Sequence, residues 1–306
     1  MIIAIVQDGP IYNDKARTIE KTCDLINKAA KQEADLIVFG ECWLSGYPFW
    51  LDICSDVANW DSDIIKGVWA DTFNHSVDVS SEDMSPIQSV LRQNKMYAVI
   101  GANEKQLTGK GNSTIYNAIL TYDDQGNLLN HHRKLMPTYT EKLVHGLGDG
   151  NGLNAISTPF GRLGSLICWE HWMPMARQVM HDENEDLHIA LWPYVKEMHH
   201  IASRHYAIEG RCHVVSVGQV IETKVLPEGL KISPAHKDDL LALKGGSAIY
   251  NSQGEAISEP IYGERKIIYQ ELDLSSNIGE RMNLSVSGHY QRGDVFEYKV
   301  NKKRLS

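Results

Sequence analysis

The chain has 306 residues, of which 42% are apolar and 23% are charged. This is ordinary globular composition with enough apolar side chains for a sizeable core, and it excludes an intrinsically disordered chain. The 39 acidic residues outnumber the 30 lysines and arginines and give a net charge of −9, which argues against nucleic acid or an anionic membrane surface as the main partner.

The cysteines are an odd number, are widely spaced and form no CxxC pair. A disulfide framework is therefore not expected, and we predict a reducing compartment, the cytoplasm. The apolar run 1–6 is too short for the core of a signal peptide, and no stretch reaches the roughly 18 apolar residues of a membrane span. The open question is whether any of the thiols is reactive: Cys23, Cys42, Cys54, Cys168 or Cys212.

Strand and helix signals alternate through the first half of the chain. A strand is predicted at 1–7 and an amphipathic helix at 14–33, with Asn13 as its N-cap. Residues 35–40 form a nearly continuous apolar run that ends at Glu41, which is typical of a buried strand. A helix, a strand and a hairpin are predicted next, at 86–95, 97–101, 114–122 and 128–134.

The second half continues the same mixture of signals. A strand at 163–167 ends at Cys168, and Pro174 suits the first turn of the helix that follows. No linker divides the chain, so the pattern predicts one α/β domain with a mixed sheet or two packed sheets. From about residue 275 the pattern is irregular, and the elements predicted before it are 187–191, 197–212, 214–221, a hairpin around 251–254, and 266–273.

Glu41 stands out because it directly follows the apolar run 35–40. Residues at the carboxyl edge of a sheet commonly carry ligand and catalytic groups. A partly desolvated carboxylate there has a raised pKa, in the range useful for a general base. The alternative is a solvated glutamate at the end of a strand.

Lys134 ends a predicted hairpin strand and precedes a loop marked by Pro137. Its ammonium group could stabilise negative charge that develops in a reaction. The alternative is a surface charge in the basic cluster 131–134. Glu141 follows in a Gly-rich loop, where it could join a polar network or be exposed. This loop lacks the spacings of a P-loop or a dinucleotide-binding motif.

Cys168 lies where a predicted strand turns into a helix, the layout of a nucleophile elbow with sulfur in place of oxygen. Backbone N–H groups in such a turn can hold an oxyanion, and a nearby lysine favours the thiolate. The alternative is a buried structural thiol. The chain has no GxSxG, HExxH or CxxC motif, and the cluster His199, His200 and His205 is interpreted as surface or supporting residues rather than as metal ligands.

Together these segments resemble the nitrilase superfamily of carbon–nitrogen hydrolases, and within it the true nitrilase branch. Glu41, Lys134 and Cys168 occur in the order of its Glu–Lys–Cys triad, and HRKLMPTYTEK with GLGDG looks like its extended lysine motif, with Glu141 at its second glutamate. CWEHWMP looks like its cysteine motif, and 287–296 looks like its C-terminal GHYxRPDVF stretch. Four positions depart from the pattern and bear on pocket shape: Gly40, Lys142, His145 and Gly293.

The resemblance implies a four-layer αββα sandwich and hydrolysis of a nitrile to the carboxylic acid and ammonia without a metal or organic cofactor. It implies one domain at 1–275, a tail at 276–306 at a subunit interface, and a homo-oligomer, either a dimer or a larger spiral. Alternatives within the superfamily are an amidase or a cyanide-hydrolysing enzyme, and outside it a non-catalytic scaffold on the same fold. Aromatic side chains beside the motifs could line a pocket for the substrate or simply pack in the core: Tyr139, Trp169, Trp172 and Trp192.

Overall fold

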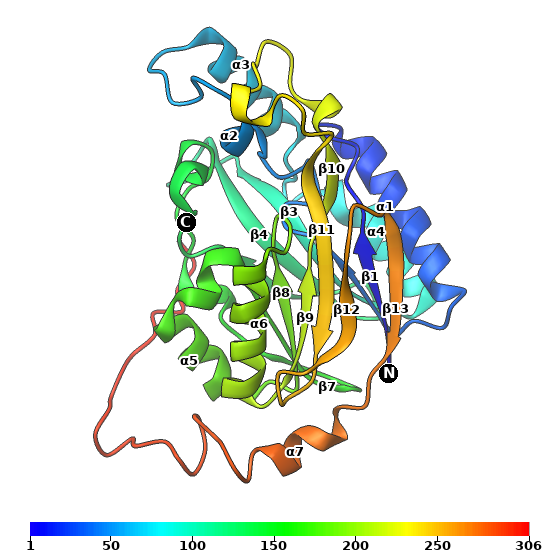
Figure 1. Ribbon diagram of the computed structural model, residues 1–306, viewed down its shortest axis with the longest axis vertical. Helices are drawn as coiled ribbons and strands as arrows, with labels where there is room; N and C mark the ends of the chain where they lie inside the picture. The colour runs from blue at the N-terminus through cyan, green and yellow to red at the C-terminus, as the bar shows by residue number, and fades with distance from the viewer. Residues whose placement is uncertain (306) are drawn as a thin grey trace.

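The computed structural model describes residues 1–305 and contains two β-sheets (Figure 1). The six strands of the first sheet lie in the order β13 (Lys266–Glu271), β1 (Ile2–Gln7), β2 (Leu36–Phe39), β3 (Tyr97–Gln106), β4 (Thr114–Tyr122) and β5 (Leu128–Arg133). Strands β1, β2 and β3 are parallel, and β4 is antiparallel to both β3 and β5. Strand β5 therefore runs in the direction of β2, and the carboxyl ends of both lie at one edge.

The second sheet has seven strands, of which β7, β8 and β9 are parallel. Its order is β10 (Val220–Glu222), β11 (Leu241–Tyr250), β9 (His213–Val217), β8 (Leu187–Leu191), β7 (Gly161–Ile167) and β6 (Ile156–Thr158), and β12 (Ala256–Tyr262) pairs with β11. The sequence predicted a single strand at 214–221. That prediction is wrong because Gly218 interrupts pairing, and its N–H donates to the Ser247 hydroxyl at 3.0 Å.

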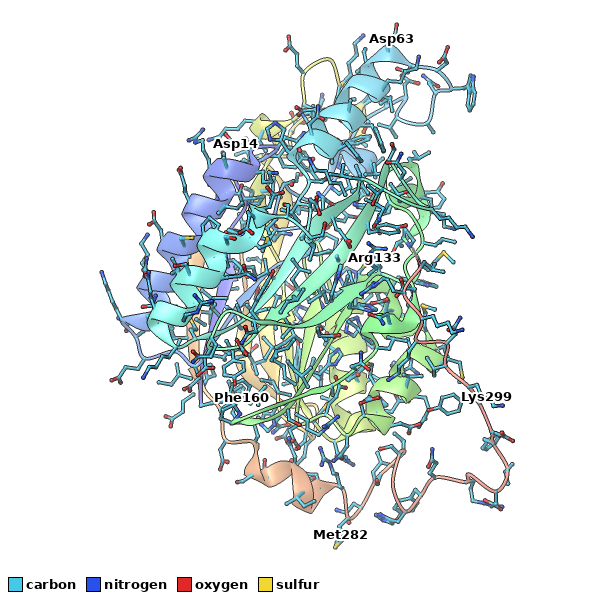
Figure 2. All side chains as sticks on the ribbon, turned by 180° about the vertical axis from the view of Figure 1, so that it is seen from behind. Asp14, Asp63, Arg133, Phe160, Met282 and Lys299 are labelled. Atoms are coloured by element: carbon cyan, nitrogen blue, oxygen red, sulfur yellow. The ribbon has the colours of Figure 1, made fainter. Side chains whose placement is uncertain are left out.

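Helices cover the outer face of each sheet, and the two inner faces pack on each other. Helices α1 (Lys15–Ala30) and α4 (Ser85–Asn94) lie side by side on the first sheet, as Figure 2 shows from behind. Helices α5 (Pro174–Asp182) and α6 (Glu197–Gly210) cover the second sheet. This order of layers confirms the predicted αββα sandwich.

Strand β1 shows how the sequence builds these layers. Ala4 and Val6 pack in the core that includes α1 and α4, whereas Ile3 and Ile5 pack in the core shared with the second sheet. Successive side chains of a strand point to opposite faces. A nearly continuous apolar run is therefore what a strand buried on both faces requires.

The predicted cap of α1 is wrong by one residue. The Asp14 side chain accepts from the Arg17 N–H at 3.0 Å and caps the helix, whereas the Asn13 side chain donates to Asp71 at 2.7 Å. Two further helices lie between β2 and β3 where the sequence predicted none, α2 (Trp50–Ile53) and α3 (Asp63–His75).

The chain after β13 contains a short 3-10 helix, η7 (Leu274–Ser276), then the short helix α7 (Asn277–Glu280), and no strand as far as residue 305. Its end returns to the first sheet, where Arg304 pairs with Asp149 at 3.2 Å and Arg133 donates to the Leu305 carbonyl at 3.3 Å (Figure 2). The irregular pattern predicted after 275 is confirmed for the described residues, and Ser306, the last residue of the predicted tail, lies outside them. Among residues 1–305 no helix is long and apolar enough to cross a membrane.

Candidate active site

Four of the residues singled out in the sequence meet where the two sheets come together. Glu41 follows β2, Lys134 follows β5, and Cys168 follows β7 of the other sheet. Glu141 lies in the one-turn helix η2 (Tyr139–Leu143). A carboxylate oxygen of each glutamate and the Cys168 sulfur lie within 4.8 Å of one another.

Lys134 joins the two carboxylates. Its Nζ donates to Glu41 Oε1 at 2.9 Å and to Glu141 Oε2 at 2.7 Å, and all three side chains are buried. Asn117 of β4 donates to the same Glu41 oxygen at 2.7 Å, and the Tyr47 hydroxyl donates to Glu141 Oε1 at 2.9 Å. These bonds fix the ammonium between the carboxylates. Glu41 Oε2 has no hydrogen-bond partner within residues 1–305 and is therefore free to take a proton.

The two glutamates have different proton affinities. Burial raises the pKa of Glu41 to about 7, against the opposing effect of Lys134. Burial also acts on Glu141, but Lys134 and His145 outweigh it and lower its pKa. Glu41 thus titrates near neutral pH, as a general base should, while Glu141 stays ionised.

Burial lowers the pKa of Lys134, but Glu141 and Glu41 together raise it well above its usual value, so the side chain remains an ammonium group. Burial raises the pKa of the Cys168 thiol, and Lys134 only partly offsets this. The resting thiol is therefore protonated. Forming the sulfur nucleophile requires a base at that moment, and Glu41, which titrates near neutral pH and has a carboxylate oxygen within 4.8 Å of the sulfur, is the better candidate of the two glutamates.

The turn at Cys168 has the strained backbone expected of an elbow. Cys168 adopts φ of 46°, a left-handed conformation that few non-glycine residues adopt. The buried Glu170 side chain holds the turn, because it accepts from the N–H groups of Ile167 and Leu135, both at 2.7 Å, and contacts His132 Nε2 at 2.9 Å. Glu170 thus links the segment that carries Cys168 to the segment that carries Lys134.

Comparison with known proteins identifies the family of the chain. The profile of the family described as carbon-nitrogen hydrolase matches residues 2–278, nearly the whole chain. The chain belongs to the carbon–nitrogen hydrolase family. An aliphatic nitrilase from Sinorhizobium fredii (strain HH103) is 32% identical, with 99% of this chain and 96% of that protein covered. The resemblance to nitrilases inferred from the motifs is thereby confirmed.

Two further relatives extend the comparison. A bifunctional nitrilase/nitrile hydratase from Nicotiana tabacum is 29% identical, with 99% of this chain and 86% of that protein covered. The crystal structure of a carbon-nitrogen hydrolase from Helicobacter pylori G27 superposes with a TM-score of 0.72 at 20% identity, with 96% of each chain covered. This likeness shows that the two proteins share the fold.

The predicted pocket aromatics occupy three kinds of environment. Tyr139 is 85% exposed, and Trp169 is 41% exposed and packs beside Trp172 with ring centroids 5.9 Å apart. Trp192 is fully buried and stacks on His199 with centroids 4.5 Å apart. A role in substrate binding therefore stays a prediction for all four, and Trp169 has the strongest case because it is adjacent to Cys168.

The histidines of α6 do not form a surface cluster, so of the two alternatives only that of supporting residues remains for His199 and His200. His199 and His200 are buried, and His200 contacts the hydroxyls of Tyr250 and Tyr262 at 2.6 and 2.8 Å. His205 alone is solvent-exposed, with an exposed side-chain fraction of 58%. Helical spacing placed the three on one helix but did not reveal which side of it the sheet covers.

The spacing of Glu41, Glu141 and Cys168 also suits three ligands of a metal ion. However, the Lys134 ammonium already bonds both carboxylates. A cation would have to displace this ammonium group, so the donor set fits acid–base and nucleophilic chemistry better than metal binding.

Asn117, Tyr47 and Glu170 complete the site, and sequence reasoning missed all three as functional residues. Asn117 is a buried amide inside a strand, which is unfavourable unless the amide has a partner. An asparagine in the middle of a predicted apolar strand was therefore the sequence signal that could have indicated a functional role for Asn117. Glu170 lay inside the cysteine motif, but its two backbone partners come from segments more than thirty residues apart.

Proposed function

We propose that this protein is a nitrilase that hydrolyses an organic nitrile to the carboxylic acid and ammonia, with Cys168 as nucleophile. The observation that carries the proposal is the buried group in which Lys134 bonds both glutamates while the Cys168 sulfur lies within 4.8 Å of their oxygens. The nitrilase relatives support the same assignment. Glu41, Lys134, Cys168 and Glu141 are the proposed catalytic residues.

In the first step the Cys168 S–H proton passes to Glu41 Oε2 as the sulfur attacks the nitrile carbon. Negative charge grows on the nitrile nitrogen, where a proton from Glu41 neutralises it and leaves a thioimidate bonded to Cys168. Lys134 stabilises the growing negative charge, and the backbone N–H of Trp169 is a second donor. One such donor contributes about 2.7–4 kcal/mol to the transition state.

Glu41, again a carboxylate, then removes a proton from a water molecule that adds to the thioimidate carbon. The tetrahedral intermediate expels its nitrogen as ammonia, and a thioester remains on Cys168. A second water, activated in the same way, breaks the carbon–sulfur bond and releases the acid. The proton returns to Cys168. Glu141 stays ionised throughout and holds Lys134 in place, since it makes the shorter of the two lysine contacts.

The proposal is tested by incubating the purified protein with aliphatic, arylaceto- and aromatic nitriles and with cyanide. Ammonia and acid are measured. We expect equimolar ammonia and acid from at least one nitrile, and no turnover by a Cys168→Ala variant with an unchanged circular dichroism spectrum. Wild-type activity in that variant would contradict the mechanism.

Amide release is a second candidate outcome, favoured by the bifunctional nitrilase/nitrile hydratase among the relatives. The tetrahedral intermediate can lose sulfur instead of ammonia, in which case the product is the amide. An amidase uses the same thioester and enters from an amide substrate. The ratio of amide to acid in the same assay, with amides added to the panel, separates the three activities.

We also propose a domain at 1–275 and a tail at 276–306 that joins subunits of a homo-oligomer. Exposed apolar side chains in the tail support an interface, among them Ile278, Met282 and Phe296. Light scattering of the full chain and of a Phe296→Asp variant tests this, because a tail interface predicts a smaller particle for the variant. The free state of all five cysteines supports a reducing, cytoplasmic location.

A further inference from the structure

A second buried polar chain begins at the backbone carbonyl of Cys168. His171 Nδ1 lies 2.9 Å from this carbonyl oxygen, and His171 Nε2 lies 3.0 Å from His188 Nε2. His188 Nδ1 lies 2.7 Å from Glu185 Oε1, and the Tyr206 hydroxyl donates to Glu185 Oε2 at 2.5 Å. All five residues are buried.

The direction of every hydrogen bond in this chain follows from its first member. A carbonyl oxygen only accepts, so His171 carries its proton on Nδ1 and its Nε2 is an acceptor. His188 must then donate from Nε2, which leaves one proton between His188 Nδ1 and Glu185 Oε1. That proton belongs either to a carboxylic acid facing a neutral ring or to a ring cation facing a carboxylate.

The surroundings favour the acid. Burial, and after it the neighbouring His181, lowers the pKa of His188 well below its usual value. Burial raises the pKa of Glu185 to about 8, and the Tyr206 hydrogen bond only partly opposes this. The other titratable or charged groups that act on Glu185 include one more acid, two arginines and a thiol: Glu183, Arg162, Arg281 and Cys212.

The fold leaves room for this carboxyl group on the strand that leads to Cys168. Gly164 of β7 lies against the Glu185 side chain, and a methyl group in its place would overlap the carboxyl oxygen. Arg281 donates to the Glu185 backbone carbonyl at 2.6 Å, and no ion pair joins the Glu185 carboxyl group to an arginine or lysine of residues 1–305.

We propose that Glu185 is a buried carboxylic acid at neutral pH and that Glu185, His188 and His171 form a positioning relay that holds the Cys168 carbonyl. The positioning role rests on the proposed function, whereas the protonation state does not. The relay gives the strained turn at Cys168 a fixed hydrogen-bond donor at its backbone carbonyl. Glu185, His188 and His171 are positioning residues, because none touches the reacting atoms.

Two substitutions separate the relay from simple packing. Glu185→Gln keeps a donor for His188 Nδ1 and an acceptor for Tyr206, whereas Glu185→Met fills the space and keeps neither. We expect Glu185→Met to lower kcat about 10-fold or more with little change in KM, because a misplaced turn slows the chemical step. Glu185→Gln should restore kcat to within about twofold of the natural protein. Equal kcat values for the two variants, or a wild-type kcat for Glu185→Met, would overturn the relay.

A spectroscopic measurement tests the protonation state without any turnover and without Glu185→Met. The infrared difference spectrum at pH 7, natural protein minus Glu185→Gln, should contain a protonated-carboxyl band that shifts in D₂O, whereas the contribution of partly protonated Glu41 is common to both proteins and cancels. Glu183→Gln, two residues away and partly exposed, is the matched control and should keep the band. Nitrogen NMR should find protons on His171 Nδ1 and His188 Nε2. Absence of the band, or a proton on His171 Nε2, would overturn the proposal and leave the proposed nitrilase activity untouched.

Discussion

Cys168 lies between two buried carboxyl groups in contrasting surroundings. Glu41 is next to an ammonium group, with Lys134 Nζ at 2.9 Å, and titrates near pH 7. Glu185 meets the His188 ring and the Tyr206 hydroxyl at 2.7 and 2.5 Å, and its pKa is raised to about 8. Burial acts on both in the same direction, so the partner decides the resting charge.

This difference separates the two requirements of a cysteine nucleophile. The thiol side, which comprises Glu41, Lys134 and Glu141, needs a base that ionises at working pH and a cation that stabilises developing negative charge. The carbonyl side, which comprises His171, His188 and Glu185, needs only a fixed geometry. Neutral hydrogen bonds provide this geometry without burying a net charge. The comparison predicts that changes on the thiol side abolish activity, whereas changes on the carbonyl side reduce it and alter the response of stability to pH.

The largest effect is expected from Lys134→Met, which removes the cation from the thiol side. Two buried carboxylates then lose their only cationic partner among the described residues and keep only neutral hydrogen-bond donors, so the free energy of unfolding should fall by about 3–5 kcal/mol and turnover should be lost. Chemical denaturation with an ammonia assay measures both. Lys110→Met, at an exposed lysine in the loop between β3 and β4, is the control and should change neither. A stable, active Lys134→Met variant would show that the ammonium group is needed neither for stability nor for turnover.

Glu41→Gln should lower kcat about 10²–10⁴-fold, because the amide cannot accept the Cys168 proton while it keeps the size of the side chain. In the natural protein Glu41 must be ionised to act, so kcat/KM should fall as pH drops through about 7. The residual activity of Glu41→Gln should lack this step. The same step in the variant would assign it to another group.

Glu170→Gln tests a third carboxylate, which joins the segments carrying Lys134 and Cys168. The amide retains one acceptor oxygen for two N–H groups that now share the carboxylate. One buried donor loses its partner, so we expect a loss of about 1–3 kcal/mol in unfolding free energy. Unchanged stability in chemical denaturation would show that the hydrogen bonds of Glu170 to the two segments do not stabilise the fold.

The smallest effect on turnover is expected on the carbonyl side, where Glu185→Gln changes the response of stability to pH. The pKa of Glu185 is about 8 when folded and near the ordinary glutamate value of about 4.3 when unfolded, so only the folded state keeps the proton between these values. This contribution to stability is fully present below the lower value and is lost as pH rises to the upper one. Glu185→Gln should flatten that decline in denaturation curves between pH 5 and 8. Parallel curves would contradict a protonated Glu185.

The sequence indicated Cys168 and the three residues of the thiol side but not Asn117 or Tyr47. Glu41 and Lys134 follow strands that end at one edge of the first sheet. Cys168 follows a strand of the second sheet, so only the resemblance of the motifs indicated that it joins them. Glu141 came from the motif, since nothing in a Gly-rich loop shows that its side chain turns back to Lys134.

The carbonyl side could not be predicted in this way. Glu185 lies in a loop, His188 in a strand and Tyr206 in a helix, so only the folded chain brings them together. Their proton states depend on burial, which a local pattern does not report. The Asn13 error has a similar cause: Asn13 and Asp14 are equally good caps, and the contact of Asn13 with Asp71 decided between them.

Trapping the covalent intermediate tests the central claim most directly. The protein is mixed with a nitrile that it turns over, quenched in acid during the steady state, and examined by intact and peptide mass spectrometry. The account predicts an added mass equal to the substrate's acyl or imidoyl group on the peptide containing Cys168, and no adduct in Cys168→Ala. Turnover with no adduct on Cys168, or with the adduct on another cysteine, would contradict it.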